Sequence, residues 1–169
     1  EEVFHLEISL GYQHRGVEEA LVSGPAKGTL HQIETLAGDT SVGHALAYCQ
    51  NIEALAGLRV SGHAHVVRAI ALELERLANH CGDLGALGGD VGFLPTAQYC
   101  GRIRGDVLNA LQVLAGNRHG RGLIRPGGVL GVPAEPALRS LAERVGKAHA
   151  EARRAVDLLL EAPSVLARF

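Results

Sequence analysis

The sequence predicts a mainly α-helical fold, a bundle of about four long helices with a short strand near its N-terminus. Several long stretches carry apolar residues three and four positions apart, which is the period of an amphipathic helix. Glycine or proline separates these stretches, so the connections between them are short. A chain of 169 residues, 47% of them hydrophobic, can bury a sizeable core, and we expect residues 1–169 to form a single domain.

The N-terminal part is expected to contain one strand and two short helices. Apolar and polar residues alternate over residues 4–10, which predicts an edge-type strand that ends at Gly11. A short helix should follow and stop at the Ser-Gly-Pro sequence of residues 23–25. A second short helix is expected over residues 27–36, before the break at Gly38.

Four long helices follow, and they are expected at residues 41–56, 63–84, 95–115 and 136–162. A Ser or Thr precedes the first of them, and a proline suits the first turn of the third and of the last. The glycine-rich residues 82–92 predict a loop or a broken helix. Residues 117–131, rich in glycine and arginine, predict an ordered loop or a short hairpin.

Charge and cysteine content exclude several functions. The net charge is −2 and no basic stripe interleaved with aromatic residues is present, so we expect no nucleic-acid binding. No apolar run is long enough to span a bilayer, which predicts no direct membrane span. Cys49, Cys81 and Cys100 are far apart and form no CxxC pair, so they are expected to be small buried residues of a protein from a reducing cytoplasm.

Glu53 is the most unusual ionisable residue, because it falls inside the apolar stripe of the first long helix. A carboxylate in that position must be paired, or its pKa rises until the group is neutral. One interpretation is structural, with a side chain that reaches solvent or accepts a bond from an arginine. The other is a carboxylate that relays protons.

Three polar clusters carry weaker patterns. One helix face collects four ionisable residues, Glu73, Arg76, His80 and Asp83. Such a face is usually solvated, unless it lies in a cleft or at a subunit interface. Residues 14–18 form a corner of basic, glycine and acidic residues that often only caps a helix. Residues 116–122 are rich in glycine and cations, but they lack the Lys-Ser/Thr pair of a phosphate-binding loop.

Six segments follow one another in an order that is hard to obtain by chance. They are Gly11–Glu18, Glu34–His44, Ala47–Leu55, Glu73–His80, Gly116–Arg118 with Ile124–Val129, and Pro163–Val165. Together they resemble the D subunit of NADH–quinone oxidoreductase (respiratory complex I) and the large subunits of membrane-bound, energy-converting nickel–iron hydrogenases and formate hydrogenlyase. The resemblance covers nearly the whole chain. It implies the central part of a longer large-subunit chain.

The resemblance implies a role in a membrane-associated redox complex. In this family a quinone or a nickel–iron centre sits in a cavity that faces an iron–sulfur cluster of a neighbouring small subunit. The chain would then pass electrons from that cluster to quinone, as in an NADH dehydrogenase, with coupling to proton movement. Its expected partners are the small iron–sulfur subunit and the membrane subunits, at the cytoplasmic face of the inner membrane. The alternative is a docking module without redox chemistry.

Several positions depart from the family pattern. The hydrogenases carry a nickel-binding CxxC where this chain has Ala37 and Thr40, which offer no thiolate, so no nickel–iron centre and no metal site are expected. Gly38 stands at the position of the tyrosine that bonds the quinone head group in the complex I subunit. Thr35 replaces an arginine near the cluster. The family histidine near the cluster falls at about Gly120, with His119 beside it.

The remaining matches give the candidate site residues. Three are expected to act as catalytic or proton-carrying carboxylates: Glu18, which resembles the hydrogenase proton gate, Glu53, and Asp90, which matches a family aspartate that couples the cavity to the membrane arm. The residues expected to bind the cofactor are Arg15, Gly38, Asp39, His44, Arg76, His119 and Arg125. Burial should raise the pKa values of Glu53 and Asp90, and a nearby arginine (Arg15, Arg76 or Arg125) should lower them.

Overall fold

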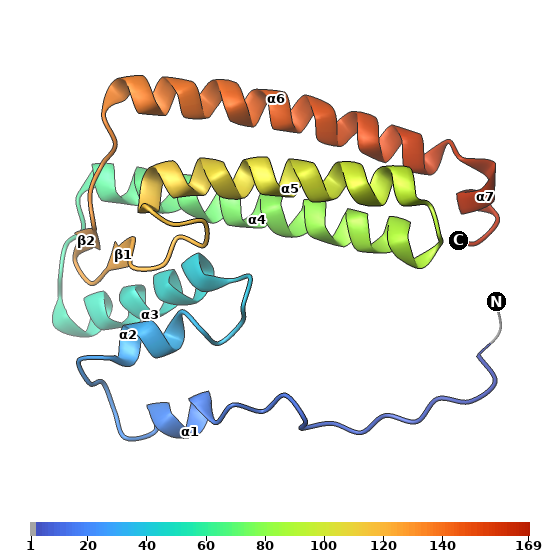
Figure 1. Ribbon diagram of the computed structural model, residues 1–169. Helices are drawn as coiled ribbons and strands as arrows, with labels where there is room; N and C mark the ends of the chain where they lie inside the picture. The colour runs from blue at the N-terminus through green and yellow to red at the C-terminus, as the bar shows by residue number, and fades with distance from the viewer. Residues whose placement is uncertain (1–2) are drawn as a thin grey trace.

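The computed structural model describes residues 3–169 and is mainly α-helical, as predicted, with four long helices and one small sheet (Figure 1). The elements are α1 (Val17–Leu21), α2 (Thr29–Ile33), α3 (Ser41–Ala56), α4 (Gly62–Asp90), α5 (Leu94–Ala115), β1 (Ile124–Arg125), β2 (Gly128–Val129), α6 (Glu135–Leu160) and α7 (Pro163–Leu166). Within the described residues, no helix has both the length and the apolar composition needed to cross a membrane.

Helix α5 is the centre of the bundle. It packs along α4 on one side and along α6 on the other, while α4 and α6 touch each other little. Helix α3 and the β1–β2 hairpin lie against the opposite side of α4, with α1 and α2 beyond them (Figure 1). The core is formed by the apolar stripes of α3, α4 and α5 with residues from the hairpin, among them Val42, Val67, Leu74, Ile103, Leu111 and Ile124.

The glycine-rich end of α4 was predicted as a loop or a broken helix, and this prediction is wrong, because α4 continues to Asp90. The glycines allow α5 to come close. A Cβ atom at Gly85 would lie 3.3 Å from Cys100 Cβ, and one at Gly88 would lie 3.3 Å from the Ala97 nitrogen. Glycine costs a helix about 1 kcal/mol per residue relative to alanine, and here close packing against α5 offsets that cost.

The predicted strand at residues 4–10 is absent from the described chain, where this segment has no regular structure. Its alternating apolar side chains are exposed, Phe4 by 93% and Leu10 by 87%. A strand needs a neighbouring strand for its backbone hydrogen bonds, and within residues 3–169 none lies beside this segment. The segment instead stands away from the bundle (Figure 1).

Residues 117–131 were predicted to form an ordered loop or a short hairpin, and the structure has the hairpin, since β1 and β2 pair antiparallel with Ile124 opposite Val129. The two short helices are also present, although α1 and α2 have only five residues each. Helix α3 ends at Gly57 and α5 at Gly116, both with positive φ, as the sequence indicates.

All three cysteines are buried and free, as predicted. Burial raises the pKa of the Cys49 thiol to about 11, and it also raises the pKa values of Cys81 and Cys100. Because only the thiolate reacts, we expect a thiol reagent at pH 8 to label the native protein far more slowly than the urea-unfolded protein. Mass spectrometry after timed labelling measures this, and rapid labelling of all three cysteines in the native protein would contradict it.

Candidate functional site

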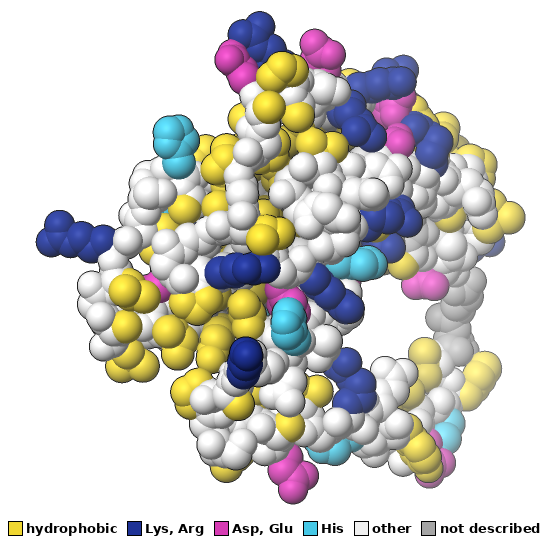
Figure 2. All heavy atoms as spheres, turned by 60° about the vertical axis from the view of Figure 1, so that its left-hand side comes forward, with side chains coloured by type: hydrophobic (Ala, Val, Ile, Leu, Met, Phe, Trp, Pro, Cys, Tyr) yellow, Lys and Arg dark blue, Asp and Glu magenta, His cyan; other side chains and the backbone are white. Residues whose placement is uncertain are grey.

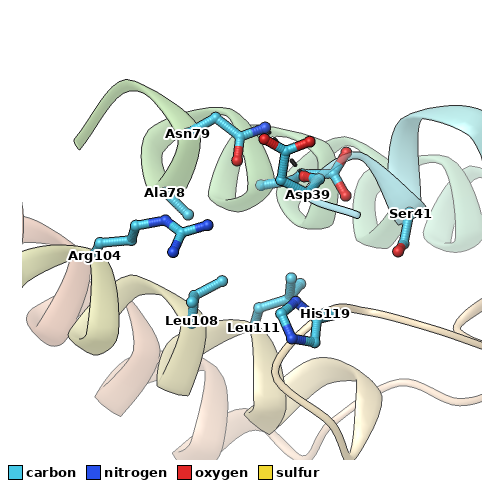
Figure 3. A pocket seen from close by; sticks show the side chains of 9 residues that line it. Asp39, Ser41, Ala78, Asn79, Arg104, Leu108, Leu111 and His119 are labelled. Carbon is cyan, nitrogen blue, oxygen red and sulfur yellow. Dashed lines mark hydrogen bonds between the residues drawn. The ribbon is translucent and has the colours of Figure 1, made fainter. Parts of the chain in front are cut away.

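The candidate site is a small cavity, lined by both polar and apolar side chains, where four parts of the chain meet: residues 37–41, α4, α5 and the loop 117–122. It is lined by Asp39, Ser41, Glu75, Ala78, Asn79, Arg104, Leu108, Leu111 and His119. Its volume is about 10 Å³, which is room for about one water molecule. Figure 3 shows Asp39, Arg104 and His119 facing this space from three sides.

The loop before α3 is fixed to α4. The Asn79 side-chain amide donates a 3.1 Å hydrogen bond to the Asp39 carbonyl oxygen (Figure 3), and the Thr40 hydroxyl donates to the Asp39 carboxylate at 3.2 Å. His44 Nδ1 lies 2.8 Å from the Thr40 carbonyl oxygen, within hydrogen-bonding distance. These bonds hold Asp39 at the edge of the cavity.

Glu75 caps α3 from outside that helix. Its carboxylate, on α4, accepts the N–H of Val42 at 2.7 Å and the N–H of Gly43 at 2.9 Å. Both N–H groups belong to the first turn of α3, which has no intrahelical acceptor for them. Glu75 is only 5% exposed. Loss of hydration raises its pKa above the usual range, and the two N–H bonds oppose that rise.

The loop 117–122 is ordered by its own side chains. The Asn117 carboxamide oxygen accepts the N–H of His119 at 3.2 Å and that of Arg121 at 3.0 Å. The buried Glu34 carboxylate accepts the Gly122 N–H at 2.6 Å, which joins the loop to the end of α2. His119 is therefore held at the cavity although its loop has no regular structure.

Arg104 brings a positive charge to the cavity from α5. Its Nε is buried and has no hydrogen-bond partner in the described chain. The backbone of α4 lies close to it, since a Cβ at Gly82 would be 3.2 Å from this nitrogen. The guanidinium points into the cavity (Figure 3), where it is available to water or to a ligand oxygen.

A second, open pocket of about 430 Å³ lies beside the cavity, and we call it the outer pocket. It is lined by Thr40, Leu72, Glu75, Arg76, Asn79, His80 and Asp83. Glu75 and Asn79 line both spaces, so Glu75 stands between the outer pocket and the cavity. All four residues of the polar face predicted on α4 are exposed, and three of them, Arg76, His80 and Asp83, line this open pocket.

No protein-family model matches the chain, but several curated proteins do. Membrane-bound hydrogenase subunit alpha of Pyrococcus furiosus is 30% identical over 129 residues, 76% of this chain. The D subunit of NADH-quinone oxidoreductase from Clostridium beijerinckii is 31% identical over 159 residues, 92% of the chain. Hydrogenase-4 component G of Escherichia coli K12 is 29% identical over 167 residues, 98% of the chain. The chain is a homologue of these redox subunits.

The homology concerns only part of each relative. The matched region makes up 30% of the Pyrococcus protein, 43% of the Clostridium protein and 30% of the Escherichia protein. The chain thus spans less than half the length of the relatives that it matches, and the similarity says nothing of their remaining parts.

Several residues of this chain that were predicted to bind a cofactor lie close together, around the cavity and the outer pocket. Asp39 and His119 line the cavity, Arg76 lines the outer pocket, and His44 is bonded to the loop between them. Gly38 belongs to the same loop and is exposed. Residues far apart in the sequence thus meet in one place, which the periodicity of the helices does not reveal.

Other predicted residues lie elsewhere. Arg15 is exposed and donates a 2.9 Å bond to the Leu36 carbonyl oxygen, and Glu18 is exposed on α1. Arg125 is exposed and bonds the Gly122 carbonyl oxygen at 3.2 Å. Asp90 is exposed at the C-terminal end of α4, about 16 Å along the helix from Asn79. The expected burial of Asp90 is therefore wrong, because the glycines before it continue the helix.

Of the two interpretations of Glu53, a structural carboxylate bonded to an arginine or a proton relay, the contacts of its side chain support the structural one. Its carboxylate forms two bonds with the buried Arg68 guanidinium, at 3.0 and 2.5 Å, and accepts the Gly127 N–H at 2.7 Å. These bonds, first of all those of Arg68, hold the pKa of Glu53 below its usual value. The arginines expected near it, Arg15, Arg76 and Arg125, are not its partners, and for Glu53 that prediction is wrong.

Sequence reasoning missed Arg68, Glu75 and Arg104. The signal for the first two was available, because each is a charged residue within four positions of several core residues of α4. A second charge of opposite sign in the neighbouring apolar stripe would have identified Arg68 as the partner of Glu53. The sequence carries no such signal for Arg104, because the feature that distinguishes it is a buried Nε without a hydrogen-bond partner in the described chain, which only the folded structure reveals.

Proposed function

We propose that this chain forms the quinone-binding part of a redox subunit that receives electrons from an iron–sulfur cluster of a neighbouring subunit. One observation carries the proposal: of the residues that the family resemblance led us to expect at the cofactor, Asp39, Arg76 and His119 line two adjoining pockets. The partners would be the iron–sulfur subunit and membrane subunits, with the complex at the cytoplasmic face of the membrane.

The outer pocket is the place for the quinone ring. Its volume of about 430 Å³ lies in the range of small-molecule sites, whereas the cavity admits only about one water molecule. Arg76, His80 and Asn79 offer donors for the carbonyl oxygens of a quinone. Reduction of a quinone to a quinol takes two electrons and two protons, and ionisable residues line both pockets.

The residues do not fit a nickel–iron centre. Nickel in such centres needs thiolate ligands, and Ala37 and Thr40 supply none. The three cysteines are buried at separate positions, and within residues 3–169 no group of three His, Cys, Asp or Glu side chains is placed to hold a metal ion.

Replacing Arg76 tests the proposal. In the assembled complex, we expect Arg76→Gln to raise the quinone concentration needed for half-maximal reduction about tenfold, because a charge-assisted hydrogen bond is lost. The matched control is Arg139→Gln, since Arg139 is also an exposed helical arginine paired with a glutamate one turn away. Quinone reduction kinetics measure both variants, and equal kinetics would end the proposal for the outer pocket.

The second candidate function is a docking module without redox chemistry. It is favoured by an apolar groove of about 720 Å³ between α4 and α6, which is lined by leucine, isoleucine and valine side chains from both helices. Further apolar side chains are exposed elsewhere on the surface (Figure 2). On this alternative, Arg76→Gln leaves quinone kinetics unchanged, while polar replacements in the groove reduce the amount of assembled complex.

A further inference from the structure

Glu75 and Glu53 are both buried, but their surroundings differ. Glu53 is held in its charged form by two bonds from Arg68. Glu75 accepts only backbone N–H groups, and within the described chain no arginine, lysine or histidine donates a hydrogen bond to it. A buried carboxylate without a bonded cation gains a proton far more easily than one that is paired.

We propose that Glu75 is a proton-exchanging carboxyl that links the outer pocket to the cavity, and that binding a proton there loosens the N-terminus of α3. Its position supports this role, because it lines both spaces while the rest of its side chain is buried. Protons reach it from the solvent side through the outer pocket. The cavity on its other side has room for about one water molecule.

The charges around Glu75 come from every element packed against it. They are His44 on α3, Asp39 in the preceding loop, Arg76, His80 and Asp83 on α4, Arg104 on α5 and His119 in the loop 117–122. His44 favours the carboxylate and Asp39 disfavours it. Arg76 is already paired with Glu73. Arg104, whose Nε has no hydrogen-bond partner in the described chain, is therefore the cation that can respond when the charge in the cavity changes.

Proton uptake by Glu75 weakens one of its two oxygens as a hydrogen-bond acceptor. The carboxylate offers one oxygen to the Val42 N–H and the other to the Gly43 N–H. When hydronium delivers a proton to one oxygen, an O–H bond forms, water is released, and that oxygen becomes a donor and a much poorer acceptor. The N–H group bonded to it then loses most of its hydrogen bond. Release of the proton to the cavity water, and from it to the His119 imidazole or the Asp39 carboxylate, restores both bonds.

Proton exchange at Glu75 is a property of this chain alone, whereas its part in coupling electron transfer to proton movement rests on the proposed function. In that role, the charge of Glu75 would control the loop before α3, which carries Asp39 at the cavity. The two ideas can fail separately. Quinone kinetics of Arg76→Gln test the proposed function, and the measurements below test Glu75 without quinone.

The experiment compares amide hydrogen exchange at several pH values in the full-length protein, in its complex where the chain requires it. Exchange rates are corrected for the intrinsic effect of pH. We expect the peptide with Val42 and Gly43 to lose about fivefold in protection as the pH falls through the raised pKa of Glu75, since one hydrogen bond is lost. The start of α4 is the internal control, because its cap is the hydroxyl of Ser61, which does not titrate.

Glu75→Gln gives the second arm. A glutamine amide presents one acceptor oxygen and cannot ionise, so we expect low protection at every pH. The infrared spectrum of the parent minus that of the variant should show one carboxylic-acid band, which appears over the pH range in which protection falls. If this variant fails to fold, the parent titration alone decides. Protection at Val42 and Gly43 that is independent of pH, or a difference spectrum without that carboxylic-acid band, would overturn the proposal.

Discussion

We expect Arg68→Met to lower the free energy of unfolding by roughly 3–5 kcal/mol, the usual cost of removing one partner of a buried ion pair. Arg68 is only 1% exposed, and its guanidinium bonds both oxygens of Glu53. It also donates to the carbonyl oxygens of Arg125 and Gly128, both at 2.9 Å. The variant therefore leaves the Glu53 charge buried with only the Gly127 N–H as a partner, and it removes a donor from two hairpin carbonyl oxygens. Urea denaturation followed by circular dichroism measures the loss.

Two further variants show that the effect belongs to the buried pair. Arg68→Met combined with Glu53→Leu should recover part of the loss, because no unpaired charge remains. Arg139→Met removes an exposed pair with Glu135 and should leave the denaturation midpoint unchanged. An Arg68→Met midpoint equal to that of the parent would show that the pair does not hold the hairpin.

The same pair sets one pH dependence. Because Arg68 lowers the pKa of Glu53 in the folded state, the pair's contribution to stability is complete above the ordinary glutamate pKa. It is lost as the pH falls through the lowered value. The contribution of Glu75 to the free energy of unfolding has the opposite pH dependence. Because its pKa is raised in the folded state, the stability that comes with its protonated form is lost as the pH rises through the raised value.

Gly120→Ala should be the second most damaging change, with a loss of roughly 2–5 kcal/mol from backbone strain and overpacking together. Gly120 has φ +68°, which side chains rarely adopt, and a Cβ there would overlap Val42 Cγ2. The backbone would have to move away from α3, and the neighbouring His119 would move with it. Thermal or urea unfolding measures the loss of stability.

Gly122 provides the matched control for Gly120. It also has a positive φ, +74°, but a Cβ there would meet no atom within 4 Å. We expect Gly122→Ala to cost only the backbone strain, about 1–2 kcal/mol. Equal losses in the two variants would mean that the contact with Val42 adds nothing and that strain alone explains both.

The long helices were predictable because each buries one stripe of apolar side chains, and these residues recur in the sequence with the helical period of 3.6 residues. The end of α4 was not, because glycines that break an isolated helix are accepted where a second helix packs closely, as Gly85 does against Cys100. The alternation over residues 4–10 is the pattern of a strand. A pattern alone does not supply the neighbouring strand that hydrogen bonding requires.

The site was predictable only in part. Asp39, Arg76 and His119 came from the resemblance to known subunits, and the structure brings them to adjoining pockets. Glu75 and Arg104 depend on features that exist only after folding: the first turn of another helix that lacks acceptors, and a guanidinium nitrogen buried without a partner in the described chain. The spacing of Glu75 among core residues of α4 indicates that it is buried, but not what it bonds, and no spacing marks Arg104.

The single guanidinium of Arg68 also imposes an order on folding. Burying it before Glu53 is in place would leave an unpaired charge, so α3 and α4 must associate first. Only then are its donors positioned for the hairpin carbonyls, which lie about sixty residues further along the chain and close a long loop. We therefore expect the hairpin to dock late, and the loop with His119 that precedes it to become ordered in the same step. In native-state hydrogen exchange the hairpin and this loop would therefore open together, at a lower free energy than the α4–α5 core.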